Sequence, residues 1–345
     1  MSPTPQLTPE AALQQGRWVK LICGAGNQDL AAIEDLCAIY ALAGVHCIDV
    51  AADLAVAAAA RRGMAWAEAR GAARPWLMVS LSDGDDPHFR KARFDPATCP
   101  ADCPRPCQRV CPALAIGDQG GVLAERCYGC GRCLPACPLG LISEQQVLLS
   151  AEAVPALLQT VQPDAVELHT QAGRQTGFAE RLQQLQASGL QLRRLAVSCG
   201  LERGAQARVN APPLSARELA GELWQRFQLL RSAGYRPLWQ LDGRPMSGDV
   251  GTGTARAAVK LLAQVRPWAP PGPLQLAGGT NAGTLALLEP GSGAAGVAFG
   301  GMARSLLQPL LLAAEQRGRS LREDPDLGGQ ALELARSLVT PWLTR

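Results

Sequence analysis

No stretch of the sequence approaches the roughly 20 consecutive apolar residues that a helix needs to cross a bilayer. The first fifteen residues, MSPTPQLTPEAALQQ, also lack the basic start and the apolar stretch of a secretory signal peptide. We therefore expect no transmembrane segment and a cytoplasmic location. Thiols stay reduced in the cytosol, so the twelve cysteines of the chain indicate metal or redox chemistry rather than disulfides.

An excess of charge of one sign is also missing. The formal net charge is only +3 and no long basic run occurs, so we expect no nucleic-acid partner. The apolar content of 47% excludes a mostly disordered chain. No Ser-His-Asp order, nucleophile elbow or Walker loop stands out, and we assign no catalytic residue.

Eight short apolar runs rich in β-forming residues alternate with longer helical patterns. The runs span residues 18–23, 46–50, 76–81, 164–169, 192–198, 236–242, 273–278 and 296–300. The helical patterns span residues 28–43, 53–70, 151–161, 175–188, 214–233, 251–265, 281–288 and 302–317. Such alternation predicts a parallel sheet with helical crossovers, and eight units that close on themselves form a TIM-like (β/α)8 barrel. An open doubly wound sheet is the alternative.

One connection, residues 82–150, is rich in Cys, Pro and Gly, whereas most βα loops have only about 2–6 residues. It predicts a module inserted after the third strand, on the face where barrel proteins build their sites. We therefore divide the chain into a disordered N-terminal lead (1–15), a (β/α)8 barrel (16–90 and 144–345) and an inserted domain (91–143).

The insert carries two cysteine motifs. The second motif has the spacing of the bacterial ferredoxin motif, with Pro138 after its last cysteine, and consists of Cys127, Cys130, Cys133 and Cys137. The first is a looser copy, with Pro112 after its last cysteine, and consists of Cys99, Cys103, Cys107 and Cys111. In ferredoxins the fourth cysteine of each motif binds the other cluster. This crossing assigns Cys111 to the second motif's cluster and Cys137 to the first motif's cluster.

These motifs predict a ferredoxin-like α+β module with two [4Fe–4S] clusters. The wider spacing of the first motif leaves a three-iron [3Fe–4S] or labile cluster open at that position. Zinc is the alternative metal for these cysteines. Structural zinc sites, however, usually pair two closely spaced cysteines with a second pair about a dozen or more residues away. Here three ligands lie within seven residues of each other, from Cys127 to Cys133, and a Cys-Pro step follows.

Glycine-rich loops follow the last two predicted strands. The seventh strand is followed by Gly278, Gly279, Thr280 and Asn281, and the eighth by Gly300 and Gly301. Barrel proteins commonly bind a phosphate at these two loops, so we expect a flavin or another phosphate-bearing ligand there. The alternative is that the glycines only permit tight turns.

Polar residues also gather at the predicted strand ends, although each is more often structural than catalytic. They are Lys20, Asp49, Asp53, Glu167, His169, Asp242, Arg244 and Asp249. Among only three histidines, His169 is the best candidate for acid–base chemistry.

The sequence resembles the LdpA family of cyanobacterial light-dependent period proteins. The resemblance rests on WVKLICGAGNQDL (18–30), AGVHCIDVAAD (43–53), the cysteine module, LDGRPMSGD (241–249) and LAGGTN (276–281). It implies an iron–sulfur protein that adjusts the circadian period to light-driven electron transport, in complex with circadian clock proteins. The resemblance implies that the eight cysteines of the module bind the clusters, and it assigns no role to any residue of the barrel mouth.

The leading hypothesis is therefore a redox-sensing iron–sulfur regulatory protein that relays cellular and photosynthetic redox state to the circadian clock. The rival is an iron–sulfur oxidoreductase that passes electrons to a flavin or phosphate-bearing ligand at the barrel mouth. A third hypothesis is a scaffold in which the clusters only hold the insert together.

Overall fold

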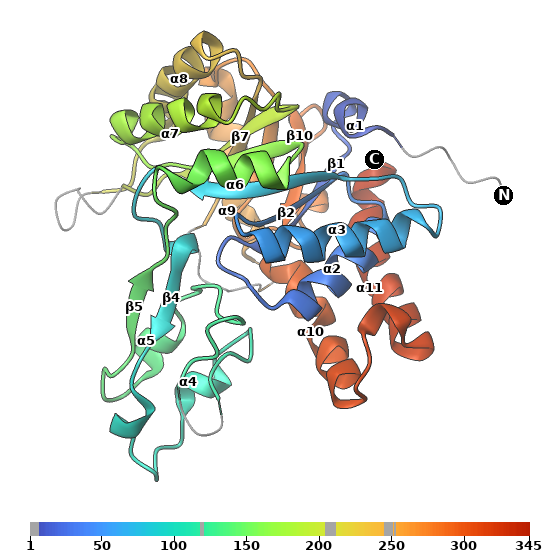
Figure 1. Cartoon of the computed structure of the whole chain (residues 1–345). Helices are drawn as coiled ribbons and strands as arrows, with labels where there is room; N and C mark the ends of the chain where they lie inside the picture. The colour runs from blue at the N-terminus through green and yellow to red at the C-terminus, as the bar shows by residue number, and fades with distance from the viewer. Residues whose placement is uncertain (1–6, 118–120, 204–211, 245–250, 252) are drawn as a thin grey trace.

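A computed structural model of the chain describes residues 7–117, 121–203, 212–244, 251 and 253–345 (Figure 1). Eight parallel strands close into a barrel in the order β1-β10-β9-β8-β7-β6-β3-β2. They are β1 (Trp18–Gly24), β2 (Cys47–Ala51), β3 (Trp76–Ser82), β6 (Ala165–His169), β7 (Arg194–Gly200), β8 (Pro237–Asp242), β9 (Leu274–Ala277) and β10 (Ala294–Phe299). Each overlaps one predicted run, so the (β/α)8 barrel is confirmed and the open sheet is excluded.

The strands are buried on both faces, as parallel strands in a barrel should be. Outward residues such as Ile48, Val50 and Leu168 pack into the main core beneath the helices. Inward residues form layers. The layer nearest the strand starts is apolar, for example Trp18, Met78 and Leu238. The next layer is polar and buried, and consists of Lys20, Asp49, Ser80, Glu167, Ser198, Gln240 and Gln275.

Helices form a ring around the strands. They are α2 (Leu30–Ala43), α3 (Leu54–Glu68), α6 (Ala153–Val161), α7 (Gln175–Ala187), α8 (Ala216–Ser232), α9 (Ala255–Val265) and α10 (Gly301–Gln316). Capping residues start several of them: Asp53 accepts the Val56 N–H at the start of α3, and Ser215 forms a capping box with Glu218 at α8. A further helix, α11 (Pro325–Leu343), packs against α2 and α10. No helix in these described ranges is both long and apolar enough to cross a membrane.

The predicted helix over 281–288 is wrong. Only a 3-10 turn, η4 (Leu285–Leu287), forms between β9 and β10. The Asn281 side chain accepts the backbone N–H of Gly283 at 2.9 Å, and the chain continues as a turn up to η4. Pro290 also disfavours a helical conformation at the residue before it, so the segment is too short for a regular helix.

The predicted disordered lead over 1–15 is also wrong in its second half. Residues Pro9–Gln15 form helix α1, with Thr8 as its N-cap and Pro9 at its first position. Ala12 and Leu13 are buried against the apolar inner layer, so α1 closes the end of the barrel where the strands begin. Glu10 fixes the helix by accepting hydrogen bonds from Arg194 and Arg236.

Between β3 and α6 the chain leaves the barrel and forms the cysteine-rich module, which extends away from it (Figure 1). Strand β4 (Arg90–Arg93) pairs antiparallel with β5 (Ser143–Gln146), and the short helices α4 (Pro106–Arg109) and α5 (Cys133–Ala136) lie between them in sequence. Strand β3 pairs directly with β6, so the barrel continues across the insertion. The boundaries 91–143 stay a prediction.

Polar contacts join the module to the barrel. The backbone N–H of Gln28, in the loop after β1, donates to the Glu125 carbonyl at 2.8 Å. The Lys91 ammonium donates to the Gln28 side chain at 2.6 Å. Arg126 bridges the two parts, since it donates to Glu315 on α10 at 2.5 Å and lies 3.5 Å from Asp29. The module therefore sits against the carboxyl-end face of the barrel.

Candidate functional site

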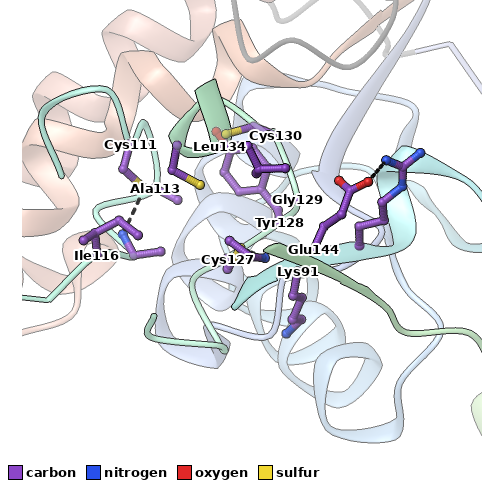
Figure 2. Close-up of a pocket in the computed structure, with 15 residues that line it drawn as sticks. Lys91, Cys111, Ala113, Ile116, Cys127, Tyr128, Gly129, Cys130, Leu134 and Glu144 are labelled. Carbon is purple, nitrogen blue, oxygen red and sulfur yellow. Dashed lines mark hydrogen bonds and ion pairs between the residues drawn. The ribbon is translucent and has the colours of Figure 1, made fainter. Parts of the chain in front are cut away.

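Four cysteines of the module line one cavity (Figure 2). Cys111 follows helix α4, Cys127 and Cys130 lie in the loop before α5, and Cys133 begins α5. The remaining wall is mainly apolar, with Ala92, Ala113, Ala115, Ile116, Tyr128 and Leu134, and the charged residues Arg90, Lys91 and Glu144 also line the cavity. The structure thus brings Cys111 from the first motif to three cysteines of the second, which is the set that crossed ligation requires.

The electrostatics of this set indicate close neighbours. Burial, and after it the nearby thiols of Cys130, Cys127 and Cys111, raise the pKa of Cys133 to about 12. Burial also raises the pKa of Cys130, with Cys111 and Cys127 adding to the effect. Thiolates crowded in such a place need a compensating positive charge, which a bound metal centre supplies.

The other four cysteines form a second group. Burial raises the pKa of Cys107, and the neighbouring Cys137 and Cys103 raise it further. Burial and the nearby Cys103 and Cys107 also raise the pKa of Cys99. Cys99, Cys103 and Cys137 are partly exposed and only Cys107 is buried, whereas two of the four cysteines in the other set are buried. Cys137 therefore lies with the first motif, as crossed ligation requires, and this group is the more open of the two.

Backbone amides point at several of these sulfurs. The Ala115 N–H donates to the sulfur of Cys111 at 3.2 Å, and the Leu141 N–H donates to that of Cys137 at 3.4 Å. Each donor is four residues after its cysteine, so the two halves of the module repeat the same local geometry. The Leu141 amide lowers the pKa of Cys137. Such donors stabilise a thiolate ligand and tune an iron–sulfur centre.

The distances between the cysteine sulfurs bear on whether the module binds zinc or an iron–sulfur cluster. Zinc bound to four thiolates at about 2.3 Å holds the sulfurs about 3.8 Å apart. Within the described ranges, no three cysteine sulfurs lie within 4.8 Å of one another. No three of the described cysteine sulfurs are therefore as close together as in a zinc tetrahedron.

The polar layer inside the barrel contains a buried ion triad. The Lys20 ammonium pairs with Glu167 and lies 3.3 Å from Asp49, and all three side chains are buried. Although burial alone would lower it, the two carboxylates raise the pKa of Lys20. Burial raises the pKa of Asp49 to about 6, whereas Lys20 holds that of Glu167 at about 2. Lys20 is thus a fixed cation rather than a nucleophile.

A cavity of about 110 Å³ opens above this layer at the barrel mouth. It gathers many of the predicted site residues, namely Glu167, His169, Asp242, Arg244, Gly278, Gly279, Thr280, Gly300 and Gly301. Asp53 does not join them, because it caps α3. Asn281 lies beside the cavity and donates to Thr254 at 3.2 Å. Asp249 falls outside the described residues.

Backbone packing explains the glycines after β9. Gly278 and Gly279 have φ angles of 65° and 89°, a region that other residues rarely adopt. A Cβ atom on Gly278 would lie 2.7 Å from the Arg244 carbonyl oxygen, and one on Gly279 would lie 2.9 Å from that of Thr254. The tight-turn alternative therefore accounts for both residues, and the phosphate or flavin site stays a prediction.

His169 ends β6 and connects the polar layer to the cavity. Its Nε2 lies 3.0 Å from Glu167 and its Nδ1 lies 3.9 Å from Asp86. Burial alone would lower its pKa, but the Glu167 and Asp86 carboxylates raise it to about 9. Its ring is tilted against that of His88, with 4.7 Å between the centroids. Asp86 and His88 lie after β3 and were missed by the sequence analysis.

Comparison with known proteins matches two segments of the chain to family models. Residues 99–148 match the LdpA Fe-S cluster-binding domain, and residues 157–341 match the Light dependent period A C-terminal domain. The protein Light dependent period A of Synechococcus elongatus (strain ATCC 33912 / PCC 7942 / FACHB-805) is 47% identical over 342 residues, which cover 96% of this chain and 93% of that protein.

The chain belongs to the Light dependent period A family. The family resemblance is thereby confirmed, and the module is an iron–sulfur cluster-binding domain.

Solved structures resemble this family member only distantly. The tryptophan synthase A-subunit of Pyrococcus furiosus is 9% identical with a TM-score of 0.42, over 94% of this chain and 98% of that one. The (S)-3-O-geranylgeranylglyceryl phosphate synthase of Thermoplasma acidophilum is 11% identical with a TM-score of 0.40, over 97% and 99% of the two chains. Likenesses at this level carry no argument about function.

Tyr128 joins the two candidate sites of this Light dependent period A family member. It follows Cys127 and lines both the cysteine cavity and the cavity at the barrel mouth. The Arg304 guanidinium lies 4.2 Å from the centre of the Tyr128 ring and donates to the Ile22 carbonyl at 2.7 Å. Tyr128 therefore contacts both the cysteine cavity and the barrel-mouth cavity.

Proposed function

We propose that this protein is an iron–sulfur redox sensor in the cytoplasm that relays cellular and photosynthetic redox state to circadian clock proteins. The observation that carries the proposal is the single cavity lined by Cys111, Cys127, Cys130 and Cys133. It combines a cysteine of the first motif with three of the second, inside a domain of the iron–sulfur cluster-binding family. A cluster held there would supply a one-electron redox couple.

The cofactor assignment follows from the two groups of cysteines. Cys111, Cys127, Cys130 and Cys133 would hold one [4Fe–4S] cluster, and Cys99, Cys103, Cys107 and Cys137 would hold the other. The second group is the candidate for a three-iron cluster, because it has the wider motif spacing and three partly exposed cysteines, against two in the other group.

Arg126 offers a route from an added electron to the protein surface. It directly precedes Cys127 and bridges the module to Asp29 and Glu315 of the barrel. A more negative cluster site attracts the guanidinium more strongly and so weakens its hold on the two carboxylates. Reduction would therefore change the contact between module and barrel, and with it a surface that a partner can bind.

The test is to measure the cluster midpoint potential with and without the clock partner, and the partner's affinity for each redox form. A useful coupling is about 1–3 kcal/mol, and because linkage is reciprocal it shifts a one-electron midpoint by roughly 40–130 mV. Arg126→Gln should reduce the shift, whereas Arg319→Gln, at an exposed position beyond α10, should not. Equal affinities and an unmoved midpoint would exclude redox signalling through that partner.

The second candidate function is an iron–sulfur oxidoreductase that passes electrons to a flavin or phosphate-bearing ligand. Tyr128 favours it, because this side chain lines both cavities and leaves little protein between them. A stoichiometric flavin in the purified protein, or hydride exchange with a nicotinamide cofactor, would support this function. A protein without flavin or turnover, whose partner affinity follows its redox state, would support the sensor.

A further inference from the structure

We propose that Asp86, His88 and His169 form a mononuclear binding site for a divalent first-row transition metal ion at the barrel mouth. One ligand atom from each residue lies within 4.8 Å of the other two. No other group of three or more His, Cys, Asp or Glu side chains meets this condition in the described part of the chain. The site is separate from the eight module cysteines and does not depend on whether their clusters sense redox state.

The distances suit a small metal ion. The Asp86 Oδ1 lies 2.7 Å from the Nδ1 of His88 and 3.9 Å from the Nδ1 of His169. Metal–ligand bonds of about 2.0–2.1 Å in a tetrahedral site separate the donor atoms by about 3.3 Å. The two observed separations lie on either side of this value, and all three donor atoms lie within 4.8 Å of one another, so a single ion is within reach of all three.

Neighbouring groups already orient the three side chains. His169 Nε2 lies 3.0 Å from Glu167, which leaves Nδ1 for a metal. A carboxylate on the far nitrogen of a ligating histidine is the usual outer partner in protein metal sites. Glu167 is itself held by Lys20 and by Gln240, whose amide donates to it at 2.9 Å. Asp86 is fixed as the cap of the 3-10 turn η1 (Pro87–Phe89), where it accepts the His88 N–H at 2.9 Å.

The site would have open coordination positions. Three protein ligands leave at least one position for water or an anionic oxygen, as in catalytic zinc sites and in iron sites with two histidines and one carboxylate. His88 and His169 line the barrel-mouth cavity, so those positions face space that a small ligand can enter. Asp242 lines the same cavity and adds a further carboxylate near the cation. The chemistry favours iron(II) or zinc(II) over magnesium, because two of the ligands are imidazoles.

The same three residues could instead form only an ion-pair network, and metal uptake separates the two cases. Cluster-loaded protein is kept anaerobic with its clusters oxidised, dialysed against a mild chelator, and then equilibrated with zinc(II) or iron(II). We expect about one added metal ion per chain above the cluster content, together with a rise in the unfolding temperature.

Asp86→Asn keeps an oxygen acceptor for the His88 N–H but removes the ligand charge, so the added ion should be lost. His88→Ala removes one donor at a side chain that is 33% exposed, and it should lose the ion without loss of the clusters. Asp85→Asn is the matched control, with the same change of charge at the neighbouring exposed residue, and it should bind like the wild type. No added metal in the wild type, or equal uptake by the Asp86 and Asp85 variants, would overturn the proposal.

Discussion

Replacing Gly129 with alanine would force the cluster-binding loop away from the barrel-proximal strand β4. Gly129 has a φ angle of 73°, and a Cβ atom there would overlap the Arg90 carbonyl oxygen and lie 3.0 Å from that of Pro87. The left-handed backbone alone costs a non-glycine residue about 1–2 kcal/mol. Overpacking against backbone atoms adds about 1–3 kcal/mol, because neither carbonyl can rotate away as a flexible side chain would.

Gly131 provides the matched control, two residues further along the same loop. Its φ angle is 75°, but a Cβ atom there would meet nothing within 4 Å. Gly131→Ala should therefore cost only the backbone term, which corresponds to about a 5- to 30-fold increase in opening of the loop. Gly129→Ala should open it about 5- to 150-fold more than Gly131→Ala, since the two differ by the overpacking term of about 1–3 kcal/mol.

The assay is the rate at which each cluster-loaded variant loses iron to a chelator under anaerobic conditions. Loss through local opening of the loop should rank the proteins as wild type, Gly131→Ala and Gly129→Ala, from slowest to fastest. Equal rates for the two variants would refute the reasoning, because they would show that the loop does not press against Arg90 in solution.

Three further predictions concern metal content, the barrel end and the insert. Protein purified anaerobically should carry about eight irons and eight sulfides per chain. Cys111→Ser and Cys137→Ser should each lose about half of this iron and sulfide, and the two variants should retain different EPR signals. Zinc without sulfide would contradict this prediction. Glu10→Gln should lower the free energy of unfolding by about 1 kcal/mol or less, since such partly exposed pairs contribute little. Burial would raise the pKa of Glu10, but Arg194 and Arg236 lower it overall. The contribution of Glu10 to the free energy of unfolding should therefore be complete above about pH 4.3 and decline at lower pH. A difference in stability between variant and wild type that does not change with pH would argue against this ion pair. Replacing residues 95–143 with a short linker should leave a folded barrel with native-like circular dichroism, and collapse of that protein would argue against an independent barrel.

The barrel and the cysteine sets were predictable because their signals are local. A parallel strand buried on both faces is a largely apolar run, so β3 and β10 could be located from the sequence alone. Cysteines close in sequence, such as Cys127, Cys130 and Cys133, have a spacing that few metal sites other than iron–sulfur clusters share. The addition of Cys111 to this set depended on the ferredoxin motif and agrees with the cavity that the four side chains line.

The missed features depend on contacts between distant parts of the chain. Helix α1 is short and its sequence is rich in Gln and Ala, but the open end of the barrel gives Leu13 a place to be buried. Asp86 and His88 lie in a segment dominated by Cys, Pro and Gly, and His169 follows 81 residues after His88. Only the pairing of β3 with β6 brings these side chains together, and no local pattern indicates it.

The buried triad of Lys20, Asp49 and Glu167 has a consequence for the order in which the chain is assembled. Lys20 is 29 residues from Asp49 but 147 residues from Glu167, and the whole cysteine module lies between Asp49 and Glu167. A buried cation without its full set of partners is costly, so the barrel cannot close stably until β6 has been synthesised. Domains fold from the N-terminus during synthesis, and the module leaves the ribosome before β6 does. The eight cysteines therefore leave the ribosome while the barrel is still open.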